Sequence, residues 1–152
     1  MHLGKIKITK GIASFPMRIE ELKQWLKTFL KNKEHPVVHL EETADTLFVE
    51  YTGEKHVYII HPHFEDKQHL LTQAAGKEHQ ITLVVLNTRK NIAQVIAWWD
   101  ILIQYPQLNI FFVAPKTNEK WVLYPSTHNK IIEPQNLEKG LHALAEGIGY
   151  DE

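Results

Sequence analysis

The strongest constraint on the fold comes from two uninterrupted apolar segments and the helical pattern between them. ITLVVLN occupies 81–87, LNIFFVAP occupies 108–115, and NIAQVIAWWDILIQYP lies between them at 91–106. Strands that are apolar at nearly every position are typical of parallel or mixed sheets, because both of their faces are covered. The order strand, buried helix, strand predicts a right-handed crossover between parallel strands. The sequence therefore predicts an α/β fold with a mixed central sheet flanked by helices.

The remaining segments predict further strands and helices around this unit. Apolar residues at helical spacing predict an amphipathic helix in MRIEELKQWLKTFLKNK (17–33), and strands at 46–52 and 55–61 are joined by the turn signal Gly53-Glu54. No internal repeat or linker interrupts the pattern, so we predict a single α/β domain over 1–152. The other predicted elements are a short strand in KIKITKGIASF that ends near Gly11, strands at 36–42 and 120–125, and helices at 64–76 and 136–148.

Composition excludes several classes of function. The 17 Lys+Arg and 18 Asp+Glu residues give a net charge of −1. This balance argues against tight, non-specific binding to duplex nucleic acid, because such binding depends on releasing many counterions. The absence of cysteine excludes thiolate metal sites and thiol nucleophiles, and there is no GxSxG, HExxH or P-loop motif. With no segment that resembles a signal peptide or a membrane span, we expect a cytoplasmic protein with no membrane partner.

One histidine-rich stretch, HPHFEDKQH at 61–69, is a candidate metal site. His61 and His63 are two positions apart, so on a strand their side chains point to the same side, and Asp66 could supply a third ligand. Imidazole and carboxylate ligands suit zinc, manganese or iron. The alternative is a solvated strand end, because ten histidines in 152 residues produce about 0.65 His-x-His pairs by chance. The chance count favours the second interpretation.

The polar loop NTRKN at 87–91 lies between a buried strand and a buried helix. In open α/β sheets, ligands bind where the carboxyl ends of strands meet the starts of helices. Asn87 or Asn91 is expected to cap the helix, and Arg89 with Lys90 could hold a phosphate at its N-terminus. The alternative, a capped helix with solvated basic side chains, is favoured because the loop has no glycine-rich cradle.

The element order resembles a known family. A helix at 17–31, three strands, a helix from Asn91 and a strand at 109–114 resemble the αβββαβ core of the PD-(D/E)XK, or restriction-endonuclease-like, superfamily, and QVIAW at 94–98 is similar to the QxxxY motif of some members. Segment 81–115 then resembles the third strand, the following helix and the fourth strand of that core. The family holds magnesium with an acid on the second strand and E/D-x-K on the third, whereas VVLNT has neither group. The resemblance therefore implies a degenerate member that does not cut. The nearest replacements are Glu50 or Asp66 for the acid and Arg89 or Lys90 for the lysine.

These observations lead to one principal functional hypothesis and two alternatives. The principal one is a non-catalytic, nuclease-like module that supports nucleic-acid binding or protein assembly. The first alternative is a small metal-dependent hydrolase, nuclease or phosphodiesterase, with a divalent metal as cofactor at His61, His63 and Asp66. The second is a homo-oligomeric scaffold such as a dimer, in which strand edges or exposed tryptophans make the contacts. The expected nucleic-acid contacts are Lys23, Lys27, Lys31, Arg89 and Lys90.

Overall fold

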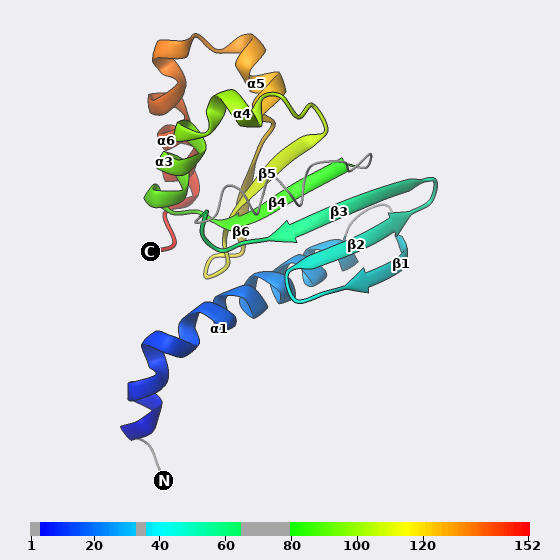
Figure 1. The fold of residues 1–152 in the computed structure, drawn as a ribbon, viewed down its shortest axis with the longest axis vertical. Coiled ribbons are helices and arrows are strands. Elements are labelled where there is room, and N and C mark those ends of the chain that lie inside the picture. The colour runs from blue at the N-terminus through cyan, green and yellow to red at the C-terminus, as the bar shows by residue number, and fades with distance from the viewer. Residues whose placement is uncertain (1–3, 33–35, 65–79) are drawn as a thin grey trace.

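The chain is built around one mixed sheet with helices on both of its faces (Figure 1). The computed structural model describes residues 4–32, 36–64 and 80–152, with side chains from residue 18 onward. The six strands of the described chain follow one another across the sheet in chain order. They are β1 (Val37–Glu42), β2 (Thr46–Tyr51), β3 (Glu54–Ile60), β4 (Gln80–Leu86), β5 (Leu108–Ala114) and β6 (Glu119–Leu123). The helices are α1 (Gly4–Lys31), α3 (Arg89–Ala97), α4 (Trp99–Leu102), α5 (Pro125–Ile131), the 3₁₀ turn η1 (Pro134–Asn136) and α6 (Leu137–Ile148).

Strand pairing confirms that the two apolar strands are parallel neighbours, as predicted. β4 lies parallel to both β3 and β5, with Leu83 in register between Ile59 and Ile110. β1, β2 and β3 form an antiparallel meander, and Gly53 takes a φ of 79° at the β2–β3 turn, a conformation that glycine adopts without steric cost. β6 returns antiparallel to β5. The carboxyl ends of β3, β4 and β5 therefore share one edge of the sheet, which we call the carboxyl edge.

Each face of the central strands has its own core, which explains why β4 and β5 are apolar at successive positions. In β4, Leu83 and Val85 belong to the core under α3 and α6, whereas Val84 and Leu86 belong to the core under α1. The helices contribute Ile92, Val95, Leu141 and Ala145 to the first core and Leu22, Leu26 and Leu30 to the second. Successive side chains of a strand point to opposite faces, so a strand covered on both faces must be apolar throughout.

The predicted strand that ends near Gly11 is wrong, because α1 extends from Gly4 to Lys31. The alternation in KIKITK is short, and in the structure this segment pairs with neither edge strand of the sheet, β1 or β6. A strand without a neighbour leaves its backbone groups unpaired, whereas a helix satisfies them internally. The amphipathic helix predicted at 17–33 is confirmed as the second half of α1.

The long apolar helix predicted at 91–106 is divided into α3 and α4 at Trp98, whose ψ is 11°. Trp99 belongs to the core under α3 and α6, and the half-buried Trp98 packs against it. Trp98 packs against Phe64 with ring centroids 5.4 Å apart, and Trp99 is buried, with its Nε1 donating to Asn129 Oδ1 at 3.0 Å. Backbone hydrogen bonds from Trp98 N–H to Gln94 O and from Leu102 N–H to Trp98 O continue past this point, so the division is a local change of backbone angle.

The C-terminal third follows the prediction except at one short helix. The strand at 120–125 is confirmed as β6 and the helix at 136–148 as α6, whereas α5 was not predicted. The helix predicted at 64–76 lies almost entirely outside the described residues.

Four described strands precede α3, one more than the αβββαβ order places before its second helix. The mixed α/β sheet is therefore confirmed, and the restriction-endonuclease-like core is not.

Candidate functional site

Four segments that are distant in sequence meet at the carboxyl edge. They are the residues after β3, the loop after β4, the turn after β5 and the stretch 149–152 after α6. Backbone hydrogen bonds join them: Leu86 N–H donates to Pro62 O at 3.2 Å, Asn87 N–H to Val113 O at 2.9 Å, and Asp151 N–H to Asn87 O at 2.8 Å. The carboxyl edge is therefore a packed junction whose side chains have defined positions.

Asn87 holds the stretch after α6 against the sheet. Its side chain is fully buried; Nδ2 donates to Ala145 O at 3.0 Å and to Gly149 O at 2.9 Å. Its Oδ1 accepts a hydrogen bond from Trp121 Nε1 at 2.9 Å. One amide thus satisfies two buried groups, on α6 and on β6, and a partly exposed carbonyl on the stretch after α6.

Asn91 has the same kind of role on the other side of the loop. Its Nδ2 donates to Pro62 O at 2.8 Å and to Leu86 O at 2.9 Å, and its Oδ1 accepts from Phe64 N–H at 3.0 Å. The expectation that Asn87 or Asn91 caps α3 is wrong, because Thr88 is the N-cap and its hydroxyl oxygen accepts from Asn91 N–H at 3.0 Å. Both asparagines instead donate to backbone carbonyls, Asn87 at the end of α6 and Asn91 at the ends of β3 and β4.

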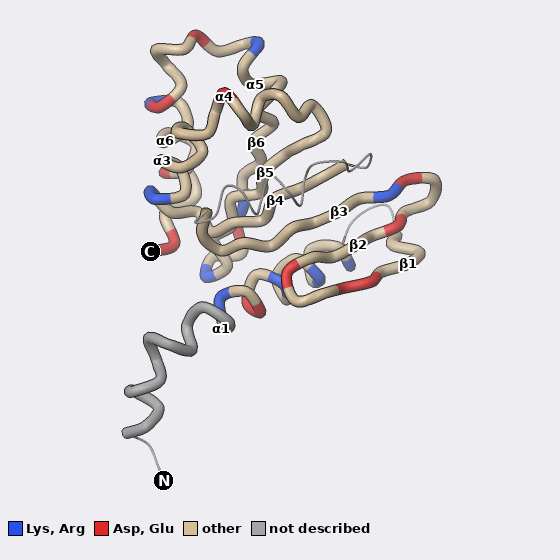
Figure 2. The backbone as a smooth tube through the Cα atoms, in the orientation of Figure 1, with Lys and Arg blue, Asp and Glu red and all other residues tan. Residues whose placement is uncertain are grey.

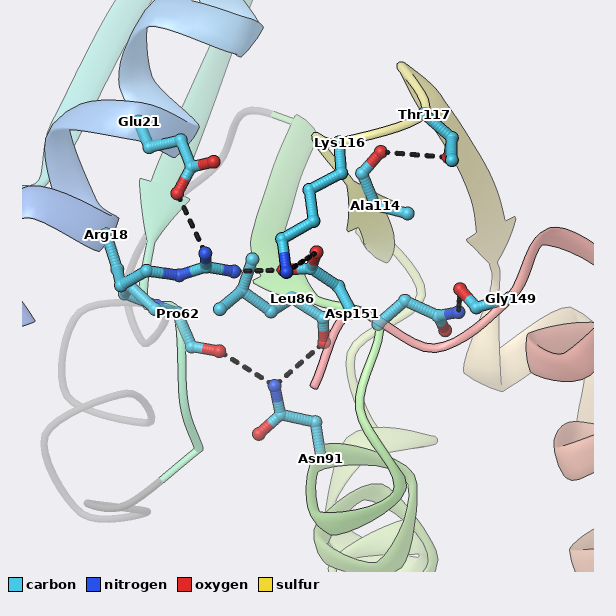
Figure 3. A network of polar contacts seen from close by, with 11 residues as sticks. Arg18, Glu21, Pro62, Leu86, Asn91, Ala114, Lys116, Thr117, Gly149 and Asp151 are labelled. Atoms are coloured by element: carbon cyan, nitrogen blue, oxygen red, sulfur yellow. Dashed lines mark hydrogen bonds and ion pairs between the residues drawn. The ribbon is translucent and has the colours of Figure 1, made fainter. Parts of the chain in front are cut away.

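A buried ion pair connects α1 to the stretch after α6 (Figure 3). The Asp151 side chain is only 1% exposed, and its Oδ2 is paired with the Arg18 guanidinium. Arg18 also contacts Glu21 at 3.0 Å, and Lys116 Nζ from the β5–β6 turn lies 4.0 Å from Asp151 Oδ1. That Oδ1 is buried and accepts no hydrogen bond from any residue in the described part of the chain. The buried carboxylate is therefore neutralised on both sides but only partly hydrogen-bonded.

Glu152, the residue after Asp151, forms a similar ion pair with Arg89 after β4. Glu152 Oε2 accepts from Arg89 N–H at 2.8 Å, and its Oε1 is paired with the Arg89 guanidinium. The guanidinium lies 4.2 Å from the centre of the Tyr150 ring, a distance at which a cation is attracted to an aromatic face. Lys90 is exposed beside it and forms no ion pair with a described residue. We call Arg18, Arg89, Lys90 and Lys116 the cation cluster, and Asp151 with Glu152 the acidic pair.

The three α1 lysines predicted to contact nucleic acid differ in exposure: Lys23 is buried, Lys27 is half-buried and Lys31 is exposed. Lys23 is 5% exposed, and its Nζ donates to Thr43 O at 2.9 Å and lies 3.5 Å from Glu42. Lys27 Nζ is 2.5 Å from Glu42, and this hydrogen bond is the main reason that the pKa of Glu42 lies below its ordinary value. Lys31 is exposed at the end of α1. Lys23 therefore connects α1 to the β1–β2 turn instead of facing solvent.

The predicted nucleic-acid contacts do not form one surface. Lys23, Lys27 and Lys31 belong to α1, whereas Arg89 and Lys90 begin α3, and the two helices cover opposite faces of the sheet. The basic side chains of α1 also lie beside an acidic strand: Figure 2 shows acidic and no basic positions on β1, whose Glu42 pairs with Lys23 and Lys27. The cation cluster keeps Arg89 and Lys90 from the prediction and adds Arg18 and Lys116, for which the local sequence contains no signal.

The predicted metal ligands lie partly outside the described residues. His61 follows the end of β3, and its Nε2 is 3.8 Å from Asp45 Oδ2. His63 is half-buried two residues later, and Asp66 lies outside the described residues. Within residues 18–32, 36–64 and 80–152, no group of three or more His, Asp or Glu side chains is placed to hold a metal ion. The His61, His63 and Asp66 site therefore stays a prediction.

A second candidate site is an open cavity of about 410 Å³ on the β1–β3 meander. Phe48 and Glu50 alternate along β2 with Leu47 and Val49, which pack under α1, so the cavity lies on the face away from α1. Glu50 is directly opposite Lys55 on β3 and His39 on β1. The other lining residues include Glu41, His56 and Val57. The cavity thus combines two carboxylates and a lysine with an apolar floor.

Comparisons with known proteins assign no function to either site. None of the helices in the described chain is both long enough and apolar enough to cross a bilayer. The functional argument therefore depends on the contacts at the carboxyl edge and in the meander cavity. Comparisons of the chain with protein-family models, with curated proteins and with solved structures found no significant match.

Proposed function

We propose that the chain is a non-catalytic binding module for nucleic acid, and that the carboxyl edge is its contact surface. The observation that carries the proposal is the convergence of Arg18, Arg89 and Lys116 from three separate elements on the adjacent carboxylates of the acidic pair. Guanidinium groups bind carboxylate and phosphate oxygens with the same geometry. Basic side chains that pair with carboxylates at the carboxyl edge are therefore chemically suited to pair with phosphates.

The position of the cluster supports the same function. Arg89 and Lys90 begin the nine-residue helix α3, where the helix dipole favours anions. Lys116 and Arg89 have side chains that are 67% and 66% exposed, so both can reach a ligand from solvent. Because the net charge is −1, we expect local contacts with a single strand and not broad attraction to duplexes.

Salt-dependent binding of a labelled single-stranded oligonucleotide tests this proposal. We expect weak binding by the unmodified chain at about 20 mM salt, with a log K against log[salt] slope of about −2 for three accessible cations. Lys90→Ala and Lys116→Ala should each weaken binding and reduce the slope by about 0.7. Fluorescence anisotropy provides the measurement.

Lys130→Ala is the matched control, because Lys130 is an exposed lysine on α5, which follows β6 at the opposite edge of the sheet. This variant should bind as the unmodified chain does. Absence of binding at low salt would refute the proposal, and so would an effect of Lys130→Ala as large as that of Lys90→Ala.

The meander cavity favours a second candidate function, a metal-dependent phosphodiester hydrolase. Glu50 on β2 stands directly opposite Lys55 on β3; this places side by side a carboxylate and a lysine, the two kinds of group that the resemblance to the PD-(D/E)XK superfamily implies and that segment 81–87, the counterpart of its third strand, lacks. Glu41 lines the same cavity. Magnesium is commonly held by one or two carboxylates together with water and substrate phosphates, which this cavity can provide.

Calorimetric titration with magnesium and manganese tests the second candidate. Glu50→Gln should weaken metal binding at least about tenfold and should remove any metal-dependent cleavage of a labelled strand. Glu119→Gln, an exposed glutamate on β6, is the control and should change neither property. Equal heats for the two variants and the unmodified chain would exclude metal binding at Glu50.

A further inference from the structure

The acidic pair occupies the cation cluster in the way that a ligand would. Asp151 forms ion pairs with Arg18 and Lys116, and Glu152 forms one with Arg89. The two carboxylates are on consecutive residues, so one short stretch of chain neutralises cations from α1, from the β5–β6 turn and from the start of α3. Figure 3 shows the Arg18 and Lys116 side chains extending toward Asp151 from different elements.

Asp151 does not fill its position completely. A carboxylate has about four sites at which it can accept hydrogen bonds, yet the buried Oδ1 accepts none from a described residue, and Lys116 Nζ remains 4.0 Å away. A phosphate has more oxygens, spread in three dimensions, and the Lys116 ammonium is on a flexible stem. An external phosphate is therefore a competitor that Arg18 and Lys116 can hydrogen-bond more fully.

The stretch that carries the acidic pair is attached by few contacts beyond its charges. Gly149 ends α6 with φ 84°, a left-handed conformation that favours glycine, and its carbonyl is fixed by Asn87. After Gly149 the described backbone contact is Asp151 N–H to Asn87 O. The other contacts are made by the Tyr150 side chain, whose hydroxyl lies 3.0 Å from His142 Nδ1. Movement beyond Gly149 therefore leaves α6 and the sheet in place.

We infer that the acidic pair is an internal competitor that occupies the phosphate positions of the cation cluster and is displaced when nucleic acid binds. This inference rests on the proposed function and names its regulation. A binding-competent state that is populated one hundredth of the time lowers apparent affinity about a hundredfold. The acidic pair thus sets a threshold, so that weak single-phosphate ligands are excluded and ligands with several phosphates bind.

Charge-neutral variants of the acidic pair test the inference. The double variant Asp151→Asn with Glu152→Gln should bind the labelled single strand about a hundredfold more tightly than the unmodified chain. Glu152→Gln alone, which leaves the buried pair intact, should tighten binding about 2- to 5-fold. The control is Glu133→Gln with Glu138→Gln, which removes the same charge from two exposed positions, one before η1 and one in the first turn of α6, and should change affinity much less.

A second measurement does not depend on folding of the variants. In the unmodified chain, a saturating oligonucleotide should accelerate hydrogen exchange of the Asp151 amide, which donates to Asn87 O, as followed by NMR. Equal tightening by the site and control variants, or an Asp151 amide that stays protected in the complex, would overturn the inference and leave the proposed function intact. Absence of binding by the unmodified chain and all variants would overturn both.

Discussion

Asn87→Ala is expected to lower the free energy of unfolding by about 4 kcal/mol, the larger of the two stability effects that we predict. The substitution leaves Trp121 Nε1, Ala145 O and Gly149 O without their partner. Trp121 Nε1 and Ala145 O are buried, and each buried group left unsatisfied costs about 1–3 kcal/mol, whereas Gly149 is exposed and its carbonyl contributes less. The loss should also detach the stretch after α6, because Asn87 is its main attachment to the sheet.

Urea unfolding followed by tryptophan fluorescence measures this effect. Asn129→Ala is the matched control: Asn129 also accepts a hydrogen bond from a tryptophan, at 3.0 Å from Trp99 Nε1, but its side chain is exposed. The control should cost about 1 kcal/mol or less. Similar losses for the two variants would show that Asn87 is not the structural centre of the carboxyl edge.

Arg18→Ala is expected to destabilise the fold by about 3 kcal/mol, because it removes the closest cation from the buried Asp151 carboxylate. We place the value at the lower end for a broken buried pair, since Arg18 is 24% exposed and Lys116 remains 4.0 Å away. Combining Arg18→Ala with Asp151→Asn should recover at least about half of the loss, because no uncompensated charge is then buried.

Thermal unfolding of the two single variants and the double variant completes the cycle. Lys27→Ala, which breaks the more exposed pair with Glu42, is the control and should have only a small fraction of the effect. If the double variant were as unstable as the sum of the single variants, Arg18 would stabilise the fold through packing of its stem and not through Asp151.

Local pattern was sufficient for most of the elements. The apolar runs of β4 and β5, the meander before them and the amphipathic face of α1 are each periodic over several residues, and burial enforces that periodicity. The strand near Gly11 failed because an alternation of a few residues does not reveal whether a neighbouring strand exists. The division at Trp98 was missed because it depends on where Phe64 and Asn129 lie in space.

The candidate site shows a sharper division. The sequence by itself determined that Arg89 and Lys90 begin a helix at the carboxyl end of a buried strand, since the order of strand, loop and helix is local. Only the tertiary structure decided that Arg18 meets Asp151, 133 residues away, and that Lys23 is buried against the β1–β2 turn. Residues that form ion pairs follow no periodic pattern in the sequence. The sequence alone therefore does not show whether a charged side chain faces solvent or a partner. Which partner it meets is set by the packing of the sheet and its helices, because packing alone brings distant segments within the few ångströms over which hydrogen bonds and close ion pairs form.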